Sequence, residues 1–159
     1  EDVTYSGTIA AAMEATLFKI RAVAMSQLLT TGEPVHWATA ERFGPDIVRQ
    51  VMTMPWPEDV LINVNFPDVP ARRVKGVKIT RQGKKKIGDQ LVERVDPRGE
   101  PYVWIGVLKQ ERSPEPGTDL AAVADGWVSV TPIHLDMTHR PTFRHLANAL
   151  GLLERPDTT

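Results

Sequence analysis

The chain opens with Glu1-Asp-Val-Thr-Tyr-Ser-Gly-Thr-Ile-Ala-Ala-Ala-Met13, a polar run that passes directly into a helical pattern. Ser6 has the chemistry of an N-cap, because its hydroxyl can accept a hydrogen bond from a free amide of the first turn. The pattern predicts a helix from Ser6 to about Arg21, with one apolar face made of Ile9, Met13, Leu17 and Ile20.

The start of this helix also suits an anion. The free amides of the first turn and the helix dipole favour negative charge there. Gly7 lets a ligand oxygen approach the backbone between the hydroxyls of Ser6 and Thr8. Ser-Gly-Thr is a common tripeptide, however. Taken by itself it favours an ordinary capped helix, with a phosphate site as the alternative.

The composition indicates a globular domain. The chain has 159 residues, of which 42% are hydrophobic and 25% charged. A formal net charge of -1 gives no general electrostatic reason to bind nucleic acid or an anionic membrane. The absence of cysteine excludes disulfides, thiolate metal sites and thiol nucleophiles, and fits a reducing cytoplasm. No apolar run approaches the roughly 20 residues of a membrane span.

Beyond the first helix, helical and strand patterns alternate, as is typical of an α/β fold. Strands are predicted over 22–26, 60–66, 74–81 and 127–131, and helices over 37–52, 119–125 and 142–150. Asn63 and Asn65 should share one face of their strand. Pro132 is expected to end the strand that begins at Trp127. Pro45 fits a first helical turn, so the regular part of the helix over 37–52 is expected to begin there.

The middle third predicts an antiparallel hairpin or meander set apart from the α/β part, with strands at 91–95 and 102–105 around the turn Asp96-Pro-Arg-Gly99. Arg81 and Lys84-Lys-Lys86 could attract a polyanion, but a solvated hairpin tip is the favoured interpretation. Tyr102 and Trp104 could stack on a base, although packing in the core or an interface is favoured.

Other polar residues give no complete catalytic constellation. Glu1 and Asp2 could touch a metal or a substrate, but a solvated acidic lead-in to the helix is favoured. Asn63 and Asn65 could be ligands or could satisfy the backbone at a strand end. Gly117-Thr-Asp119 reads equally well as an anion contact or as a capped helix start. No metal-ligand spacing links the four histidines, which are His36, His134, His139 and His145.

Four segments in series resemble the SurE family of 5'/3'-nucleotidases in both order and spacing. They are Asp2-Val-Thr-Tyr-Ser-Gly-Thr-Ile-Ala-Ala-Ala-Met-Glu14, Leu61-Ile-Asn-Val-Asn-Phe-Pro67, Gly117-Thr-Asp119 and Trp127-Val-Ser-Val-Thr-Pro-Ile-His-Leu-Asp136. The resemblance runs from Glu1 to about Leu150. The chain departs from the family pattern at two places. Trp127 stands where the family usually has Tyr, and Thr138-His-Arg140 is an atypical version of the segment after Asp136.

This resemblance implies an α/β, Rossmann-like three-layer sandwich with a protruding β-hairpin and a C-terminal segment exchanged between subunits. Residues 1–70 would be the C-terminal half of the core. Residues 71–112 would be the hairpin extension, and 113–159 would return to the core and form an oligomerisation arm. The expected assembly is a homodimer or tetramer.

The resemblance also implies a phosphomonoesterase that depends on Mg or Mn and hydrolyses nucleoside monophosphates in the cytoplasm. Ser6, Gly7 and Thr8 match the family's phosphate-binding element. The family's metal ligands match nothing in this chain. They are therefore expected upstream of Glu1, and the chain is expected to be a C-terminal part that is inactive alone, with no catalytic residue or metal ligand of its own. The alternative is a non-catalytic oligomerisation or nucleic-acid-binding module that uses the basic hairpin.

Overall fold

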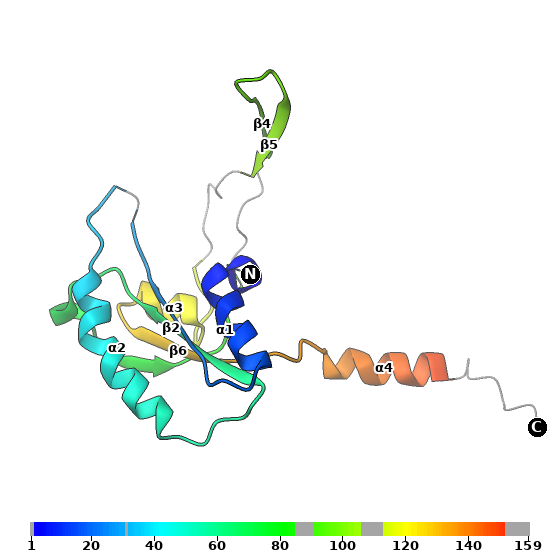
Figure 1. Ribbon diagram of the computed structural model, residues 1–159, viewed down its shortest axis with the longest axis horizontal. Coiled ribbons are helices and arrows are strands. Elements are labelled where there is room, and N and C mark those ends of the chain that lie inside the picture. Colours follow the sequence, from blue (N-terminus) through cyan, green and yellow to red (C-terminus); the bar gives the residue numbers. More distant parts are fainter. Residues whose placement is uncertain (1, 31, 85–90, 106–112, 152–159) are drawn as a thin grey trace, which may run out of the picture.

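The structure is a computed structural model that describes residues 2–30, 32–84, 91–105 and 113–151 (Figure 1). The helices are α1 (Gly7–Leu17), α2 (Trp37–Met52), α3 (Asp119–Ala124) and α4 (Arg140–Leu150), with short 3-10 turns at Asp2–Tyr5 and Ala71–Arg73. The strands are β1 (Val23–Gln27), β2 (Val60–Phe66), β3 (Val77–Ile79), β4 (Leu91–Val95), β5 (Pro101–Ile105) and β6 (Val128–His134). None of the helices in these ranges is long and apolar enough to cross a membrane.

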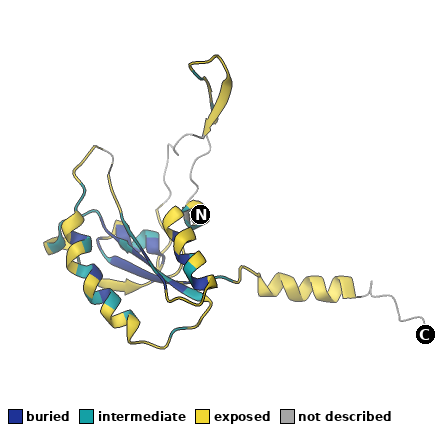
Figure 2. Cartoon of the chain, in the orientation of Figure 1, coloured by how far each residue is buried: buried dark blue, intermediate teal, exposed yellow. Residues whose placement is uncertain are grey.

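Four strands form the central sheet in the order β1-β2-β6-β3. The strand β2 runs parallel to β1 and antiparallel to β6, whereas β3 runs parallel to β6. Helix α1 packs on one face through Ile9 and Ala12, which cluster with Leu61 of β2. Helix α2 covers the other face through Ile47, which packs in a cluster with Phe66. The predicted three-layer α/β arrangement is thus confirmed, and Figure 2 shows its buried residues gathered along the sheet.

Helix α1 begins as predicted but ends earlier. Ser6 precedes it in an extended conformation, and its Oγ accepts a hydrogen bond from the amide of Ile9 at 3.2 Å. The helix stops at Leu17, and the chain turns at Lys19, whose φ of 60° lies in the left-handed region. The predicted apolar face is therefore wrong at its C-terminal end, where Leu17 and Ile20 are 67% and 59% exposed.

Helix α2 has the predicted bounds but does not begin at Pro45, which lies inside it. The chain approaches the sheet closely at Gly44, where an added Cβ would lie 3.6 Å from the Phe66 ring. Its apolar face is formed by Ile47, with Phe43 and Val51 partly buried against the same cluster.

Strand β6 continues through Pro132, so the expectation that this proline ends it is wrong. The amide of Ile62, which is registered with Pro132, donates to the carbonyl of Ala22, the residue just before β1. The pair Ile62 and Pro132 is therefore not hydrogen-bonded, and the proline nitrogen points away from β2. On that side β6 pairs with β3 only over Val128 to Val130, so no described strand needs an amide from Pro132.

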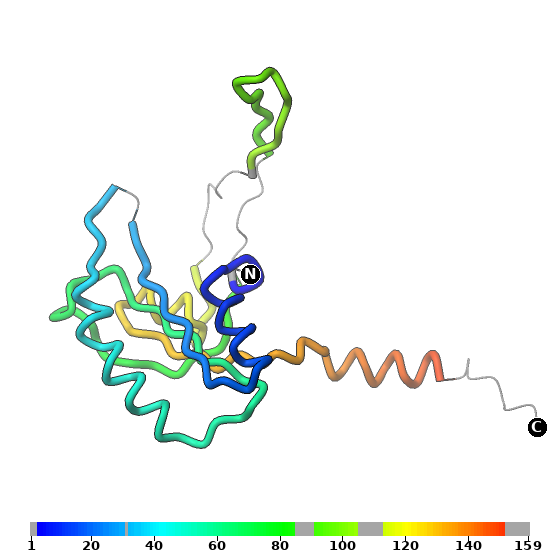
Figure 3. The backbone as a smooth tube through the Cα atoms, viewed as in Figure 1, coloured from blue at the N-terminus to red at the C-terminus, as the bar shows by residue number. Residues whose placement is uncertain are grey.

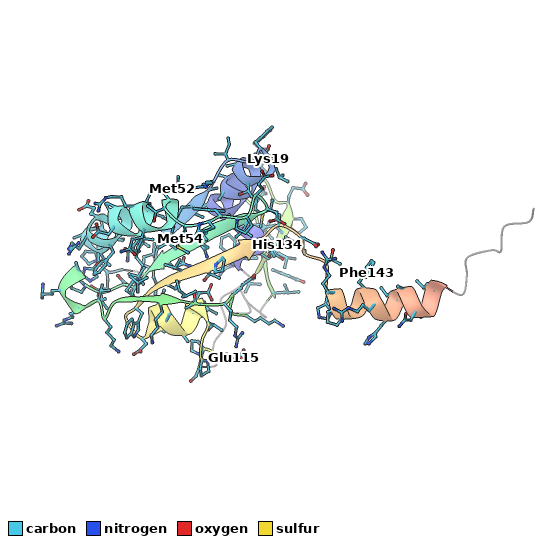
Figure 4. The ribbon with its side chains drawn as sticks, turned by 90° about the horizontal axis from the view of Figure 1, so that it is seen from below. Lys19, Met52, Met54, Glu115, His134 and Phe143 are labelled. Carbon is cyan, nitrogen blue, oxygen red and sulfur yellow. The ribbon has the colours of Figure 1, made fainter. Side chains whose placement is uncertain are left out.

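Two elements lie away from the sheet (Figures 1 and 3). Strands β4 and β5 form the predicted antiparallel hairpin, and Asp96 Oδ1 accepts from the amides of Arg98 and Glu100 in its turn. Tyr102 and Trp104 are 44% and 60% exposed, so the described chain gives them no core packing. Helix α4 is exposed along its length, and Phe143 stands near its start, away from the body in Figure 4.

Arg81, the first residue of the basic segment, is not at the hairpin tip, contrary to the favoured interpretation. The tip is the turn at Asp96, whereas Arg81 forms an isolated bridge with Thr118 beside α3. Arg81 also forms an ion pair with Glu115, so its charge is already partnered. Lys85 and Lys86 lie outside the described residues.

Candidate functional site

A pocket of about 270 Å³ lies where β1 and β2 end. Carboxyl ends of parallel strands are the usual ligand-binding edge of open α/β sheets. Polar residues from five parts of the chain line this pocket together with apolar ones. The polar side chains are those of Ser6, Ser26, Gln27, Asn63, Asn65, Gln82 and Asp119. Segments far apart in the sequence therefore converge at one site.

The sheet register explains why this pocket is polar. Asn63 is registered with Ala24 and Thr131, and Asn65 with Ser26 and Ser129. Registered neighbours point to the same face, so these polar side chains share the side that α1 covers. We call this side the polar face, and the side under α2 the apolar face. The prediction that Asn63 and Asn65 share a face is confirmed by this register.

Asn63 is the most deeply placed amide in the pocket. Only 4% of the residue is exposed, yet its side chain forms no hydrogen bond within the described residues. It therefore does not serve the backbone at a strand end, which was one of its two predicted roles. Its amide atoms are not among the fully buried atoms that lack a hydrogen-bond partner, so the amide opens into the pocket and can bind a ligand or water there.

Other hydroxyls on the polar face divide into paired and unpaired groups. The Oγ1 atoms of Thr80 and Thr131 lie 2.7 Å apart and share a hydrogen bond. Ser129 is fully buried, and its Oγ has no hydrogen-bond partner among the described residues. Ser129 does not line the pocket, so it supplies a comparison with Asn63.

The start of α1 forms one wall of the pocket, where Ser6 lines it. Gly7 and Thr8 follow Ser6 at the same helix end but are exposed. An added Cβ at Gly7 would meet no atom within 4 Å, so the backbone there is open to approach. Phosphate binding by Ser6, Gly7 and Thr8 stays a prediction, and the geometry is suitable for it, because first-turn amides lack acceptors within the helix.

The start of α3 also lines the pocket, through Asp119 and Leu120. Thr118 is its N-cap, as predicted, with Oγ1 accepting from the amide of Ala121 at 3.2 Å. Asp119 is 8% exposed, and its Oδ1 accepts from the amides of Gly83 and Leu120 at 2.7 and 2.8 Å. Glycine is needed at position 83, since an added Cβ would lie 2.9 Å from that oxygen.

Sequence reasoning missed Ser26, Gln27 and Gly83 as pocket residues. Ser26 gave a usable signal, because it ends a predicted strand at the edge where ligands bind. Gly83 gave none, because its role depends on Asp119, which is 36 residues away in the sequence.

The pocket has an unusual charge for an anion site. Among the described residues, no Lys, Arg or His side chain lines it, and Asp119 is the one charged residue. His134 Nε2 instead contacts Asp59 Oδ2 at 2.7 Å, and His139 Nδ1 contacts Thr142 Oγ1 at 2.7 Å. A carboxyl with a shifted pKa also lies outside the pocket. The hydrogen bond from Lys75 holds the pKa of Asp125 below its ordinary value.

The described residues also do not fit a metal site. Nowhere in these ranges do three His, Cys, Asp or Glu side chains come together as a metal-binding group. Within the pocket, Asp119 is the single carboxylate, and its Oδ1 is already engaged by two backbone amides. The sequence analysis predicts that the whole chain lacks metal ligands. Because some residues lie outside the described ranges, this stays a prediction.

Residues 1–89 match the family described as Survival protein SurE. The chain belongs to the SurE family. Among similar curated proteins, the 5'-nucleotidase SurE of Paramagnetospirillum magneticum is 55% identical over 149 residues, covering 94% of this chain and 57% of that protein. The 5'-nucleotidase SurE of Parvibaculum lavamentivorans is 47% identical over 162 residues, covering 98% of this chain and 57% of that protein.

A solved SurE structure supports the same fold. The crystal structure of the SurE protein from Aquifex aeolicus matches with a TM-score of 0.76 and 36% sequence identity, over 94% of this chain and 59% of that one. The chain thus spans between one half and two thirds of the length of the SurE proteins it matches. The family resemblance that the four sequence segments indicate is therefore confirmed.

Proposed function

We propose that this chain forms one wall of the substrate site of a nucleotidase that hydrolyses nucleoside monophosphates to nucleoside and phosphate. The observation that carries the proposal is Ser6, which caps α1 and lines the pocket at the strand ends. The names of the SurE relatives, 43–55% identical to this chain, point to the same activity. In this proposal, Ser6, Gly7 and Thr8 bind the phosphate.

The chain's own residues would hold and stabilise the reacting group. The Ser6 Oγ accepts from Ile9, which leaves its own proton free to donate to a phosphate oxygen. The amides of Gly7 and Thr8 lie in the same first turn and can donate to further oxygens. As negative charge shifts between oxygens during phosphoryl transfer, these fixed donors and the helix dipole stabilise it without rearranging.

A divalent metal, Mg or Mn, is part of this proposal, although the described residues offer no site for it. When bound, such an ion neutralises charge on a phosphoryl group. We propose that its ligands come from family residues outside those described here. The chain of 159 residues would then bind phosphate without completing the reaction. We also place the protein in the cytoplasm, which fits its lack of cysteine.

Assembly into a homodimer or tetramer belongs to the same proposal. Phe143, Leu146 and Leu150 recur at helical spacing on α4 and are each more than half exposed. An amphipathic helix with no covered face in its own chain gains stability by packing against another. Exchange of the C-terminal segment between copies would provide that cover.

Measurement of phosphate release tests the proposed function. The protein at the full length of its relatives should hydrolyse nucleoside monophosphates with added Mg²⁺ or Mn²⁺ and stop when a chelator removes the metal. The chain of 159 residues alone should release no phosphate under the same conditions. Metal-dependent turnover by this chain alone would contradict the proposal that the metal ligands lie outside the described residues. An inactive full-length protein would contradict the nucleotidase assignment.

A further inference from the structure

We propose that the floor of the pocket is a sugar-hydroxyl subsite, in which Asn63 and Asp119 bind the ribose of the nucleoside monophosphate. This inference rests on the proposed function, in which the phosphate lies at the start of α1. It adds a second part of the substrate and two residues that recognise it.

Asn63 provides the first argument. Its amide is buried and lines the pocket, and no described residue forms a hydrogen bond with it. The amide can donate two hydrogen bonds and accept others. A ribose hydroxyl both donates and accepts, so it complements this group.

The charge of the pocket shows which part of a nucleotide belongs at its floor. The described part of the lining contains no cationic side chain, and Asp119 contributes a carboxylate. A phosphate placed deep in this pocket would meet that negative charge at short range, which is unfavourable. Sugar hydroxyls are neutral and do not meet this repulsion. The phosphate therefore belongs at the helix end and the sugar at the floor.

Asp119 adds an acceptor of the appropriate kind. Its Oδ1 is fixed by the amides of Gly83 and Leu120, and within the described chain no hydrogen bond engages its Oδ2. Carboxylates commonly accept hydrogen bonds from ribose hydroxyls in nucleotide-binding α/β folds. The two backbone bonds hold this carboxylate in place, so it is preorganised for a ligand.

The size of the pocket is consistent with a sugar inside it and a phosphate at the start of α1. Its volume of about 270 Å³ lies just below the range of roughly 300–1,000 Å³ that is typical of sites for drug-sized ligands. The pocket thus has room for a sugar ring, while the phosphate and the base would extend from it.

The test compares three substrates with the full-length protein. They are a ribonucleoside 5'-monophosphate, its 2',3'-dideoxy analogue and phenyl phosphate, which has no sugar. The unchanged protein should prefer the ribonucleotide over the dideoxy analogue by at least about tenfold in kcat/KM, as expected for loss of hydrogen bonds to the Asn63 amide and to the Asp119 carboxylate. Asn63→Ala should remove most of this preference, chiefly through KM, and leave phenyl phosphate hydrolysis within about twofold.

Ser129→Ala is the matched control, since it removes a buried polar group from the same face outside the pocket. It should keep the full preference for the ribonucleotide. If Asn63→Ala slows all three substrates equally, or changes none, the sugar subsite is wrong. A lowered unfolding temperature together with equal loss on all substrates would also overturn it in favour of a structural role. If the unchanged protein releases no phosphate from any substrate, the proposed function fails and the subsite fails with it.

Discussion

The two faces of one sheet serve different purposes in this chain. On the apolar face, Val64 and Phe66 of β2 are fully buried beneath α2. On the polar face, Asn63 and Asn65 alternate with them along the same strand and line a pocket. A single strand therefore supplies both core and candidate site, because successive side chains point to opposite sides.

This contrast shows why the pocket can be polar without weakening the domain. The apolar face packs five buried residues into one cluster, so that side can support the strands. On the side that we call the polar face, the part of the sheet beneath α1 carries apolar residues, and there Ala24 and Leu61 pack with Ile9. Polar side chains replace them only toward the strand ends. Among the described residues, three buried side-chain atoms lack a hydrogen-bond partner: Gln27 Oε1 belongs to a residue that lines the pocket, whereas Asp68 Oδ1 and Ser129 Oγ do not.

The largest effect on stability should come from Phe66→Ala. This ring is 1% exposed in the cluster under α2, and its removal leaves a cavity. We expect the free energy of unfolding to fall by about 3–5 kcal/mol, measured by urea denaturation. The protein that remains folded should keep its preference for ribonucleotides, because the apolar face does not line the pocket.

Phe18→Ala makes the same chemical change where the ring is 70% exposed. It should alter the free energy of unfolding by no more than about 0.5 kcal/mol. Equal losses for the two variants would show that the apolar face is not the main source of stability. Loss of ribonucleotide preference in Phe66→Ala would show that the two faces are not separable.

A smaller effect is expected from hydroxyls on the polar face. Ser129→Ala removes a buried hydroxyl that has no partner, and should leave stability unchanged or raise it by up to about 1 kcal/mol. Thr131→Val removes a hydroxyl that pairs with Thr80, and should cost about 1–2 kcal/mol. Thermal or urea unfolding distinguishes the two. A clear loss of stability in Ser129→Ala would mean that its Oγ has a partner such as an ordered water.

Much of the fold could be predicted from local patterns. The apolar spacing of α2 and the alternation of β2 gave both elements their observed bounds, and Thr118 and Ser6 gave the start of each capped helix. Local rules were wrong where the neighbouring strand decides the outcome. Pro132 is tolerated in β6 because the amide of Ile62 donates to the carbonyl of Ala22, on the side of β2 away from β6, and the sequence around Pro132 contains no trace of that bond.

The candidate site could be predicted only in part. Ser6 was predicted from its position before the helix, and it lines the pocket. Asn63 and Asn65 were predicted to share a face, but their partners across the sheet depend on the register of β1 and β6. The contact of Gly83 with Asp119 joins residues far apart in the chain, and no pattern of periodicity or spacing reveals it.

The central claim is that the start of α1 binds the phosphate of the substrate. It is tested most directly by the kinetics of Ser6→Ala and Thr8→Ala in the full-length protein, with Thr16→Ala as control. Thr16 donates from the other end of the same helix to the carbonyl of Ala12 and does not line the pocket. The account predicts that kcat/KM for nucleoside monophosphates falls by about a hundredfold in Ser6→Ala and about tenfold in Thr8→Ala, and stays within about twofold in Thr16→Ala. Unchanged kinetics in Ser6→Ala and Thr8→Ala would contradict the claim and leave Ser6 as a structural cap.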